Sequence, residues 1–297
     1  MQKDHKWSIH NYLNHRDEGL YSKLELSNSQ TSFLKNLRKQ ARNRIREAFT
    51  EVQAVFRTIK RPSNPLAATS ESIREPLYQL LRVQKSLSHV DSSMLDTLVK
   101  LASNLNEKQQ QAFLDIRPKF RTQGSFQYKT LNVPYCKPPQ EMDIDDGVYF
   151  PMQMFEDAPA LAHSLMIALV DGALQSLVAE NTGWEFDDSK PTCSRIRVRS
   201  DNVHLDVPMY AIPEDQFVQM KESVLDSQFG MESFSANSEF WLSEGNLLDQ
   251  DSVLLARRDR DKWQKSDPQV VQKWFIDSVN EVGEHLRLAC RFLKSWR

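Results

Sequence analysis

The spacing of apolar residues changes twice along this chain, and these changes limit the fold to a mixture of helices and strands. In residues 34–59 apolar side chains recur every three or four positions, which is the spacing of one face of a long helix. Residues 70–89 and 91–105 repeat this helical spacing. Short alternating runs then dominate residues 118–213, and helical spacing returns in residues 214–297. The chain is therefore predicted to have an α+β fold.

The central region supplies most of the expected strands. The strand-like segments are 120–124, 141–150, 192–199 and 203–212, with one apolar helix over 158–180 among them. Asp91 is the expected N-cap of the third helix, because an aspartate there precedes a run with helical spacing. Residues 1–30 show no clear period and are expected to form an arm or a short helix.

The last part of the chain is expected to end in one long helix. Pro268 suits the first turn of that helix, since proline lacks the N–H that a first turn leaves unpaired. Three tryptophans of this region, Trp263, Trp274 and Trp296, are expected to be core residues. We divide the chain into a core with N-terminal helices, 1–213, and a helical C-terminal lobe, 214–297. The lobe is expected to be incomplete, because the helical pattern runs to the last residue.

Composition excludes several classes of protein. The chain has 297 residues, with 38 Lys and Arg, 40 Asp and Glu, and a formal net charge of −2, so no general coat of nucleic acid is expected. Its three cysteines are too few for a disulfide framework and lack metal-ligand spacing. No apolar run of the roughly 18 residues that span a bilayer, and no signal sequence, is evident. We therefore expect a soluble protein of the cytoplasm.

One segment is locally basic. Residues 35–61 hold nine Lys and Arg but only two acids, Glu47 and Glu51. Such a helix could bind DNA or RNA, or it could pack on the core with a solvated basic face or line a substrate cleft. We favour the second interpretation and expect no nucleic-acid partner.

The residues most indicative of chemistry are a Gly-Ser turn and three aspartates. Asp143 and Asp145 are two positions apart in strand-like sequence, so their side chains are expected on one face. Adjacent carboxylates repel one another unless a cation or proton neutralises them, and carboxylate oxygens suit Mg²⁺. Asp206, on another expected strand, would complete a two-metal site for phosphoryl displacement. The Gly124-Ser125 turn offers backbone N–H groups and a hydroxyl to a phosphate.

The Asp-x-Asp pattern alone is weak. It occurs three times, at 143/145, 249/251 and 259/261. The last two pairs are interpreted as solvated acidic surface. Only the first follows a Gly-Ser turn and lies in alternating sequence, which favours a catalytic role for it.

Together these residues resemble a known family. The segments that carry the resemblance are Gln123–Phe126, Tyr128–Asn132, Pro138–Gln140, Asp143–Gly147, Asp206–Pro213, Trp263, Ser266–Pro268, Trp274–Phe275 and Cys290–Arg297. They are similar to the bacterial cGAS/DncV-like nucleotidyltransferases (CD-NTases), and among these to the dinucleotide cyclases. The resemblance covers most of the chain from about residue 110 to the end.

The resemblance implies a polymerase-β-like nucleotidyltransferase fold, with a mixed palm sheet, a long spine helix and a helical C-terminal lobe. It implies synthesis of 3′,3′-cGAMP from ATP and GTP with two Mg²⁺ ions, which Mn²⁺ could replace. The product would act on a separate effector protein in anti-phage (CBASS) defence. It also implies further family helices beyond the position of Arg297.

The resemblance also implies roles for particular residues. Asp143, Asp145 and Asp206 match the metal-binding triad. The positions that match nucleotide contacts are Gln123, Gly124, Ser125, Tyr128, Arg195, Ser266 and Lys294. For Arg195 on a strand and Lys294 on the last helix, a solvated side chain is the alternative, and the motif match favours the nucleotide contact. The seven histidines show no metal spacing and are assigned no role.

Two alternative functions remain open from the sequence. The first is a nucleotidyltransferase that makes another cyclic or linear oligonucleotide, or that transfers a nucleotide to a protein or RNA. The second is a nucleotide-binding module without turnover. The identity of the product would distinguish the first alternative, and nucleotide binding without release of pyrophosphate would indicate the second.

Overall fold

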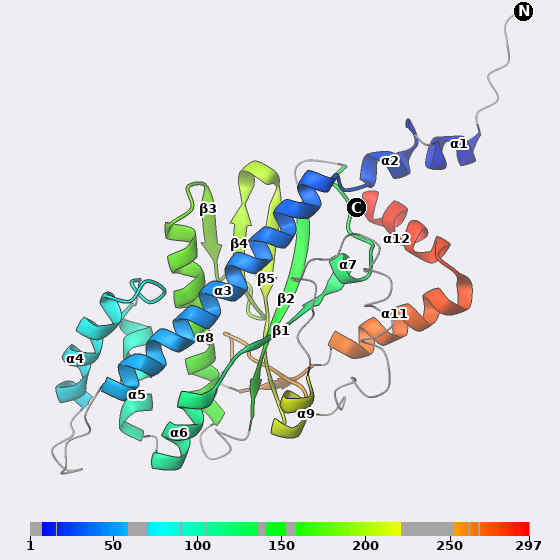
Figure 1. The fold of residues 1–297 in the computed structure, drawn as a ribbon. Coiled ribbons are helices and arrows are strands. Elements are labelled where there is room, and N and C mark those ends of the chain that lie inside the picture. Colours follow the sequence, from blue (N-terminus) through cyan, green and yellow to red (C-terminus); the bar gives the residue numbers. More distant parts are fainter. Residues whose placement is uncertain are drawn as a thin grey trace, which may run out of the picture.

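The computed structural model describes residues 8–15, 17–58, 70–89, 91–104, 106–135, 140–152, 159–220, 252–260, 262–266 and 268–296. It confirms the predicted α+β class: helices flank a mixed eight-stranded sheet (Figure 1). The helices are α1 (Ile9–Asn14), α2 (Leu20–Leu24), α3 (Asn28–Thr58), α4 (Ser70–Arg82), α5 (Ser92–Asn104), α6 (Glu107–Asp115), α7 (Gly124–Gln127), α8 (Pro159–Ala179), α9 (Glu214–Gln219), α11 (Pro268–Val282) and α12 (His285–Ser295). The strands are β1 (Lys119–Gln123), β2 (Met142–Pro151), β3 (Trp184–Asp187), β4 (Ser194–Val198), β5 (Val203–Val207), β6 (Met209–Ile212), β7 (Leu254–Leu255) and β8 (Gln264–Lys265).

The sheet is organised around β2, which pairs with three other strands. β1 pairs with it in antiparallel orientation, whereas β5 and β6 pair with it in parallel orientation and in one continuous register. The predicted strand over 203–212 is thus divided at Pro208, which has no N–H for the ladder. β4 and β3 extend the sheet beyond β5, and β7 and β8 extend it beyond β6, all in antiparallel orientation.

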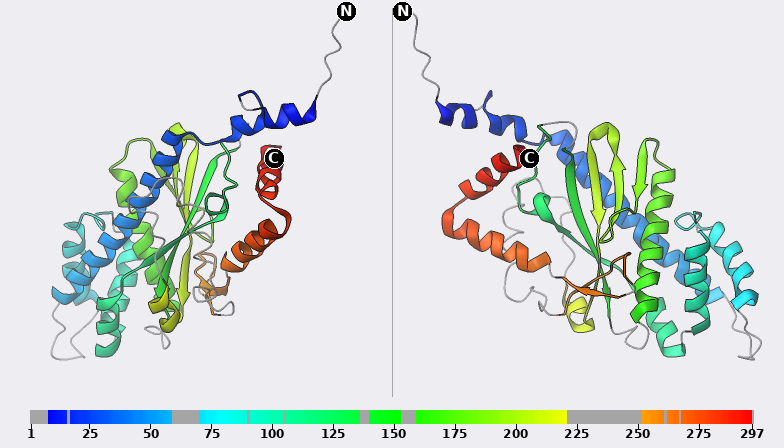
Figure 2. Two further views of the ribbon diagram at one scale, coloured as in Figure 1. Left: turned by 45° about the vertical axis from the view of Figure 1, so that its right-hand side comes forward. Right: turned by 180° about the vertical axis from the view of Figure 1, so that it is seen from behind.

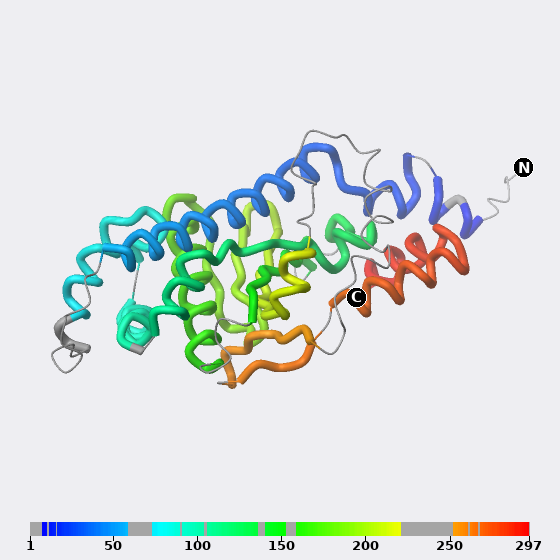
Figure 3. The backbone as a smooth tube through the Cα atoms, turned by 60° about the horizontal axis from the view of Figure 1, so that its bottom comes forward, coloured from blue at the N-terminus to red at the C-terminus, as the bar shows by residue number. Residues whose placement is uncertain are grey.

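The helices lie in two groups on opposite sides of the sheet. The long helix α3 crosses one face, with α8, α4, α5 and α6 on the same side (Figures 1 and 2). Helices α11 and α12 stand on the other side, and α12 contacts α2 (Figures 2 and 3). The main core lies between the first group and the sheet, and it includes Leu37, Phe49 and Leu169. The second face of the sheet is therefore left for the site described below.

The N-terminal helices form where the apolar spacing predicts them. The buried face of α3 includes Leu34, Ile45 and Val52, which lie on the predicted stripe. Asp91 caps α5 as predicted, since its Oδ1 accepts a hydrogen bond of 2.7 Å from the Met94 N–H.

Helix α8 is more apolar than the sequence analysis allowed. Among the described residues, it is long and apolar enough to cross a membrane by length and composition alone. However, 61% of its most apolar window is buried, and it packs against α3, α5 and β4. We therefore interpret it as a core helix.

Three expectations for the second part of the chain are corrected. The final helix is broken at Gly283, which lies between α11 and α12. Its φ of 96° is readily adopted by glycine but does not continue a helix. Trp274 and Trp296 are 66% and 76% exposed rather than buried, whereas Trp263 is partly buried against the core. The part that begins at residue 214 is not wholly helical, because β7 and β8 join the sheet.

Several residues named in the sequence analysis lie outside the described residues. They are Pro138, Pro139, Asp249, Asp251, Asp261, Asp267 and Arg297.

Candidate active site

Strand pairing brings the three predicted aspartates together. In the register of β2 and β5, Asp145 lies opposite Asp206, and Asp143 lies opposite His204. Side chains directly opposite each other on paired strands share a face of the sheet, as do residues two positions apart. Asp143, Asp145 and Asp206 therefore project from the same face, although the last two lie 61 positions apart in the sequence.

That face is the one away from α3. Asp146, which alternates with Asp145 on β2, points the other way and accepts two hydrogen bonds from Arg42 of α3. Asp143 and Asp145 therefore lie at the candidate site on one face of the sheet. Asp146 forms an ion pair with Arg42 of α3 on the other face.

The Gly-Ser turn lies beside the central carboxylate. β1 ends at Gln123, which is paired with Asp145, and α7 starts at Gly124. Gly124 has a φ of 64°, and a Cβ atom there would collide with Oδ2 of Asp145. Only glycine fits both the left-handed backbone and the close approach of the carboxylate. Ser125 Oγ in turn donates to the backbone oxygen of Asp143, at 3.4 Å.

The surroundings of Asp145 favour the protonated, uncharged form of its carboxyl group. Burial raises the pKa of Asp145 to about 7, and the neighbouring carboxylates of Asp143 and Asp206 act in the same direction. A divalent cation would remove this repulsion, and its preferred ligands are carboxylate oxygens. The donor set of the three aspartates therefore fits a magnesium-type ion.

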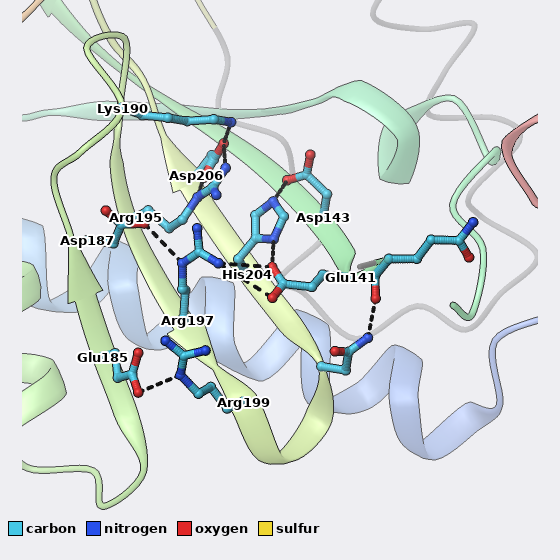
Figure 4. Close-up of polar contacts among 12 residues, drawn as sticks. Glu141, Asp143, Glu185, Asp187, Lys190, Arg195, Arg197, Arg199, His204 and Asp206 are labelled. Carbon is cyan, nitrogen blue, oxygen red and sulfur yellow. Dashed lines mark hydrogen bonds and ion pairs between the residues drawn. The ribbon is translucent and has the colours of Figure 1, made fainter. Parts of the chain in front are cut away.

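Asp206 is held by two basic residues. Arg195 on β4 donates to both of its oxygens, at 2.5 and 2.8 Å, and Lys190 Nζ donates at 2.7 Å (Figure 4). Burial tends to raise the pKa of Asp206, but Arg195 and Lys190 outweigh it and hold this pKa below its ordinary value. Arg195, predicted as a nucleotide contact, thus lies beside the triad. Lys190, in the β3–β4 connection, was not predicted.

His204 is a second residue that sequence reasoning missed. Its Nε2 lies 2.9 Å from Asp143 Oδ1, although not aligned for a regular hydrogen bond, and its Nδ1 lies 2.8 Å from Glu141 Oε2 (Figure 4). One ligand atom each from Asp143, His204 and Asp206 lie within 4.8 Å of one another. A signal existed in the sequence, because His204 precedes Asp206 by two positions, as Asp143 precedes Asp145.

Two further predicted residues lie near the triad. Gln123 is buried. Its Nε2 donates a hydrogen bond of 2.9 Å to the Tyr149 hydroxyl, and its Oε1 accepts one of 3.2 Å from the Tyr210 hydroxyl. Tyr128 packs against Phe275 of α11 with ring centroids 5.1 Å apart. Burial raises the pKa of Tyr128 to about 12, with a smaller contribution from the charge of Asp145.

The last two predicted residues come from the second part of the chain. Lys294 Nζ on α12 donates to the backbone and side-chain oxygens of Thr130, at 3.2 and 3.1 Å. Burial lowers the pKa of Lys294, although Asp143 and Asp145 are close enough to oppose this. Ser266 follows β8 and donates its N–H to Val253 O. Within the described part of the chain its side chain makes no hydrogen bond to the other predicted residues.

Comparison with known proteins identifies the family. A profile of the cyclic GMP-AMP synthase DncV-like nucleotidyltransferase domain matches residues 118–210, which contain β1 to β5 and the first half of β6. The cyclic GMP-AMP synthase of Vibrio cholerae serotype O1 is 43% identical over 298 residues, and that of Escherichia coli is 41% identical over 297. Each alignment covers 98% of this chain and 66% of the relative, so the chain spans just under two thirds of these curated relatives.

Solved structures agree with this relationship. V. cholerae DncV in complex with GTP and 5MTHFGLU2 matches with a TM-score of 0.79 and 40% identity, covering 98% of this chain and 68% of that one. DncV with the linear intermediate 5′ pppA(3′,5′)pG matches with a TM-score of 0.78 and 39% identity, covering 98% and 67%. The fold is thus that of a polymerase-β-like nucleotidyltransferase, as predicted. The chain belongs to the DncV-like nucleotidyltransferase family.

Proposed function

We propose that this protein is a cyclic dinucleotide synthase that joins ATP and GTP into 3′,3′-cGAMP. The observation that carries the proposal is the convergence of Asp143, Asp145 and Asp206 beside the Gly124-Ser125 turn. Identity of 43% to a cyclic GMP-AMP synthase supports the choice of substrates and product.

In this proposal, Asp143, Asp145 and Asp206 hold two Mg²⁺ ions, or Mn²⁺ in their place. When bound, these ions would neutralise the charge that develops on the phosphate and on the attacking and leaving oxygens. We also assign to Asp206 a role in deprotonating the attacking 3′-hydroxyl. Arg195 orients Asp206 through its two hydrogen bonds.

The remaining residues position the nucleotides. Ser125 and Lys294 are assigned to phosphate oxygens, to which hydroxyl and ammonium groups donate. Gln123, Gly124, Tyr128, Arg195 and Ser266 complete the proposed nucleotide contacts. Catalysis would then derive from alignment of the reacting groups and from stabilisation of charge.

The proposed role is that of a signalling enzyme of the bacterial cytoplasm. The cyclic product would be a second messenger in anti-phage (CBASS) defence and would act on a separate effector protein. The family relationship supports this assignment.

A product assay tests the proposal. The purified chain is incubated with Mg²⁺ and labelled ATP, GTP, CTP and UTP, singly and in pairs, and then treated with phosphatase. We expect a phosphatase-resistant product that requires ATP and GTP together. A resistant product from other nucleotides, or a linear one, would indicate the first alternative function. Nucleotide binding without release of pyrophosphate would indicate a binding module without turnover.

A further inference from the structure

The carboxylate of Asp143 lies against a residue on the neighbouring strand. His204 lies opposite Asp143 in the β2–β5 register, and its Nε2 approaches Asp143 Oδ1 to 2.9 Å. Oδ1 is buried, although the Asp143 side chain as a whole is 39% exposed. The ion-pair contact therefore involves the buried oxygen, although the two atoms are not aligned for a regular hydrogen bond, and the exposed part of the side chain lies away from it.

His204 is itself fixed from the opposite side of its ring. Its Nδ1 lies 2.8 Å from Oε2 of Glu141, the residue immediately before β2. Only 9% of His204 is exposed, so the imidazole has little freedom to turn between the two carboxylates. Glu141 thereby determines which ring nitrogen faces Asp143.

A chain of alternating charges supports Glu141. Arg197 Nη1 on β4 lies 3.5 Å from both oxygens of Glu141, and Arg197 Nε lies 3.0 Å from Oδ2 of Asp187 on β3. Asp187 also accepts the Ser189 N–H at 2.9 Å. As Figure 4 shows, the contacts run from Asp143 across β5 and β4 to β3. The contacts that lead from Asp143 through His204, Glu141 and Arg197 to Asp187 therefore involve the four strands β2, β5, β4 and β3.

We propose that His204 and Glu141 are positioning residues for Asp143: they fix its buried oxygen so that the other oxygen is presented to the metal ion. The inference rests on the proposed function, in which Asp143 is a metal ligand. Groups that orient a ligand in this way typically contribute 10–100-fold to metal affinity. Neither residue is required to touch the metal or the nucleotide.

Two substitutions of His204 separate its two contacts. The side-chain amide of glutamine reaches the position of Nε2, whereas that of asparagine reaches the position of Nδ1. His204→Gln therefore keeps a donor toward Asp143, and His204→Asn keeps only a donor toward Glu141. The two variants are close in size and polarity, so a merely structural role predicts the same result for both.

The readout is Mn²⁺ affinity, measured from the electron paramagnetic resonance signal of free Mn²⁺, together with the thermal unfolding midpoint without metal. We expect His204→Asn to weaken Mn²⁺ binding by about 10–100-fold, and His204→Gln to remain within about threefold of wild type. The unfolding midpoints of the two variants are expected to agree. Glu141→Ala is expected to weaken binding in the wild-type background and to add little to His204→Asn, because both act through one carboxylate.

The outcomes distinguish this inference from the proposed function. If the wild-type chain binds no Mn²⁺, or if Asp143→Asn binds it equally well, the assignment of Asp143 as a metal ligand is wrong and the inference is overturned with it. If Asp143→Asn abolishes binding but His204→Asn and His204→Gln behave alike, only the positioning role is overturned. Directly bound ¹⁴N in the spin-echo spectrum of the Mn²⁺ complex would also overturn it, since His204 would then be a ligand.

Discussion

Removal of Asp146 is expected to destabilise the fold strongly, because this residue balances a charge inside the protein. Arg42 of α3 donates to Asp146 Oδ2 and Oδ1, at 2.6 and 2.5 Å, and the two side chains are only 1% and 3% exposed. Thr122 of β1 bridges the pair, donating to Asp146 at 3.0 Å and accepting from Arg42 at 3.1 Å. This network joins α3 to β1 and β2, two of the strands that carry the candidate site.

In Asp146→Ala, the guanidinium of Arg42 stays buried without its counter-ion. Breaking such a pair from one side typically costs about 3–5 kcal/mol, which is a large part of the roughly 5–15 kcal/mol that stabilises a native protein. We therefore expect the free energy of unfolding, measured by urea denaturation, to fall by about 3–5 kcal/mol. Replacing both partners, as in Arg42→Met with Asp146→Leu, should recover most of the loss, since no buried charge remains.

An exposed ion pair provides the control. Lys273 and Asp277 on α11 are 2.7 Å apart, but their side chains are 44% and 57% exposed. Asp277→Ala should change the free energy of unfolding by no more than about 0.5 kcal/mol. A loss below about 1 kcal/mol in Asp146→Ala would refute the reasoning, because the pair would then not be shielded from water as its burial indicates.

Three further predictions concern the neighbourhood of the site. Gly124→Ala should lower the free energy of unfolding by about 1–2 kcal/mol, because alanine disfavours the left-handed backbone. The added Cβ should also displace the Asp145 carboxylate, so that Mg²⁺ no longer raises the thermal unfolding midpoint. Hydrogen bonds from Ser189 hold the pKa of Asp187 at about 2. Because this pKa lies below the ordinary value, ionised Asp187 stabilises the fold fully above about pH 4, and this contribution is lost as the pH falls through about 2. Ser189→Ala should raise the pKa of Asp187, as NMR titration would show. Burial raises the pKa of the Cys193 thiol to about 12, so it should resist iodoacetamide at a pH near 8 until urea unfolds the chain.

Local patterns explain what the sequence could predict of this fold. The apolar stripe that includes Leu34 and Ile45 predicts α3, because a helix buries every third or fourth residue. The alternation of Asp143, Ile144 and Asp145 predicts β2 and the shared direction of the two acids. These properties depend on neighbouring residues along one chain segment.

The rest of the site depends on which strands become neighbours. His204 acquires its position only because β5 pairs with β2, and Lys190 reaches Asp206 only because β4, which follows the β3–β4 connection, pairs with β5. A single sequence does not give that order of strands. The break at Gly283 was missed for a local reason, since apolar spacing continues on both sides of a glycine that ends one helix.

The measurement that tests the account most directly compares the wild-type chain with the variant Asp143→Asn, Asp145→Asn in the nucleotide assay. We expect the wild-type chain to form a phosphatase-resistant product from ATP and GTP, and the variant to form none while keeping the same circular dichroism spectrum. Neutral amides cannot replace the two carboxylates as ligands of a divalent cation without a large loss of affinity. Product formation by the double variant at a rate comparable to wild type would contradict the assignment of these aspartates and the function built on them.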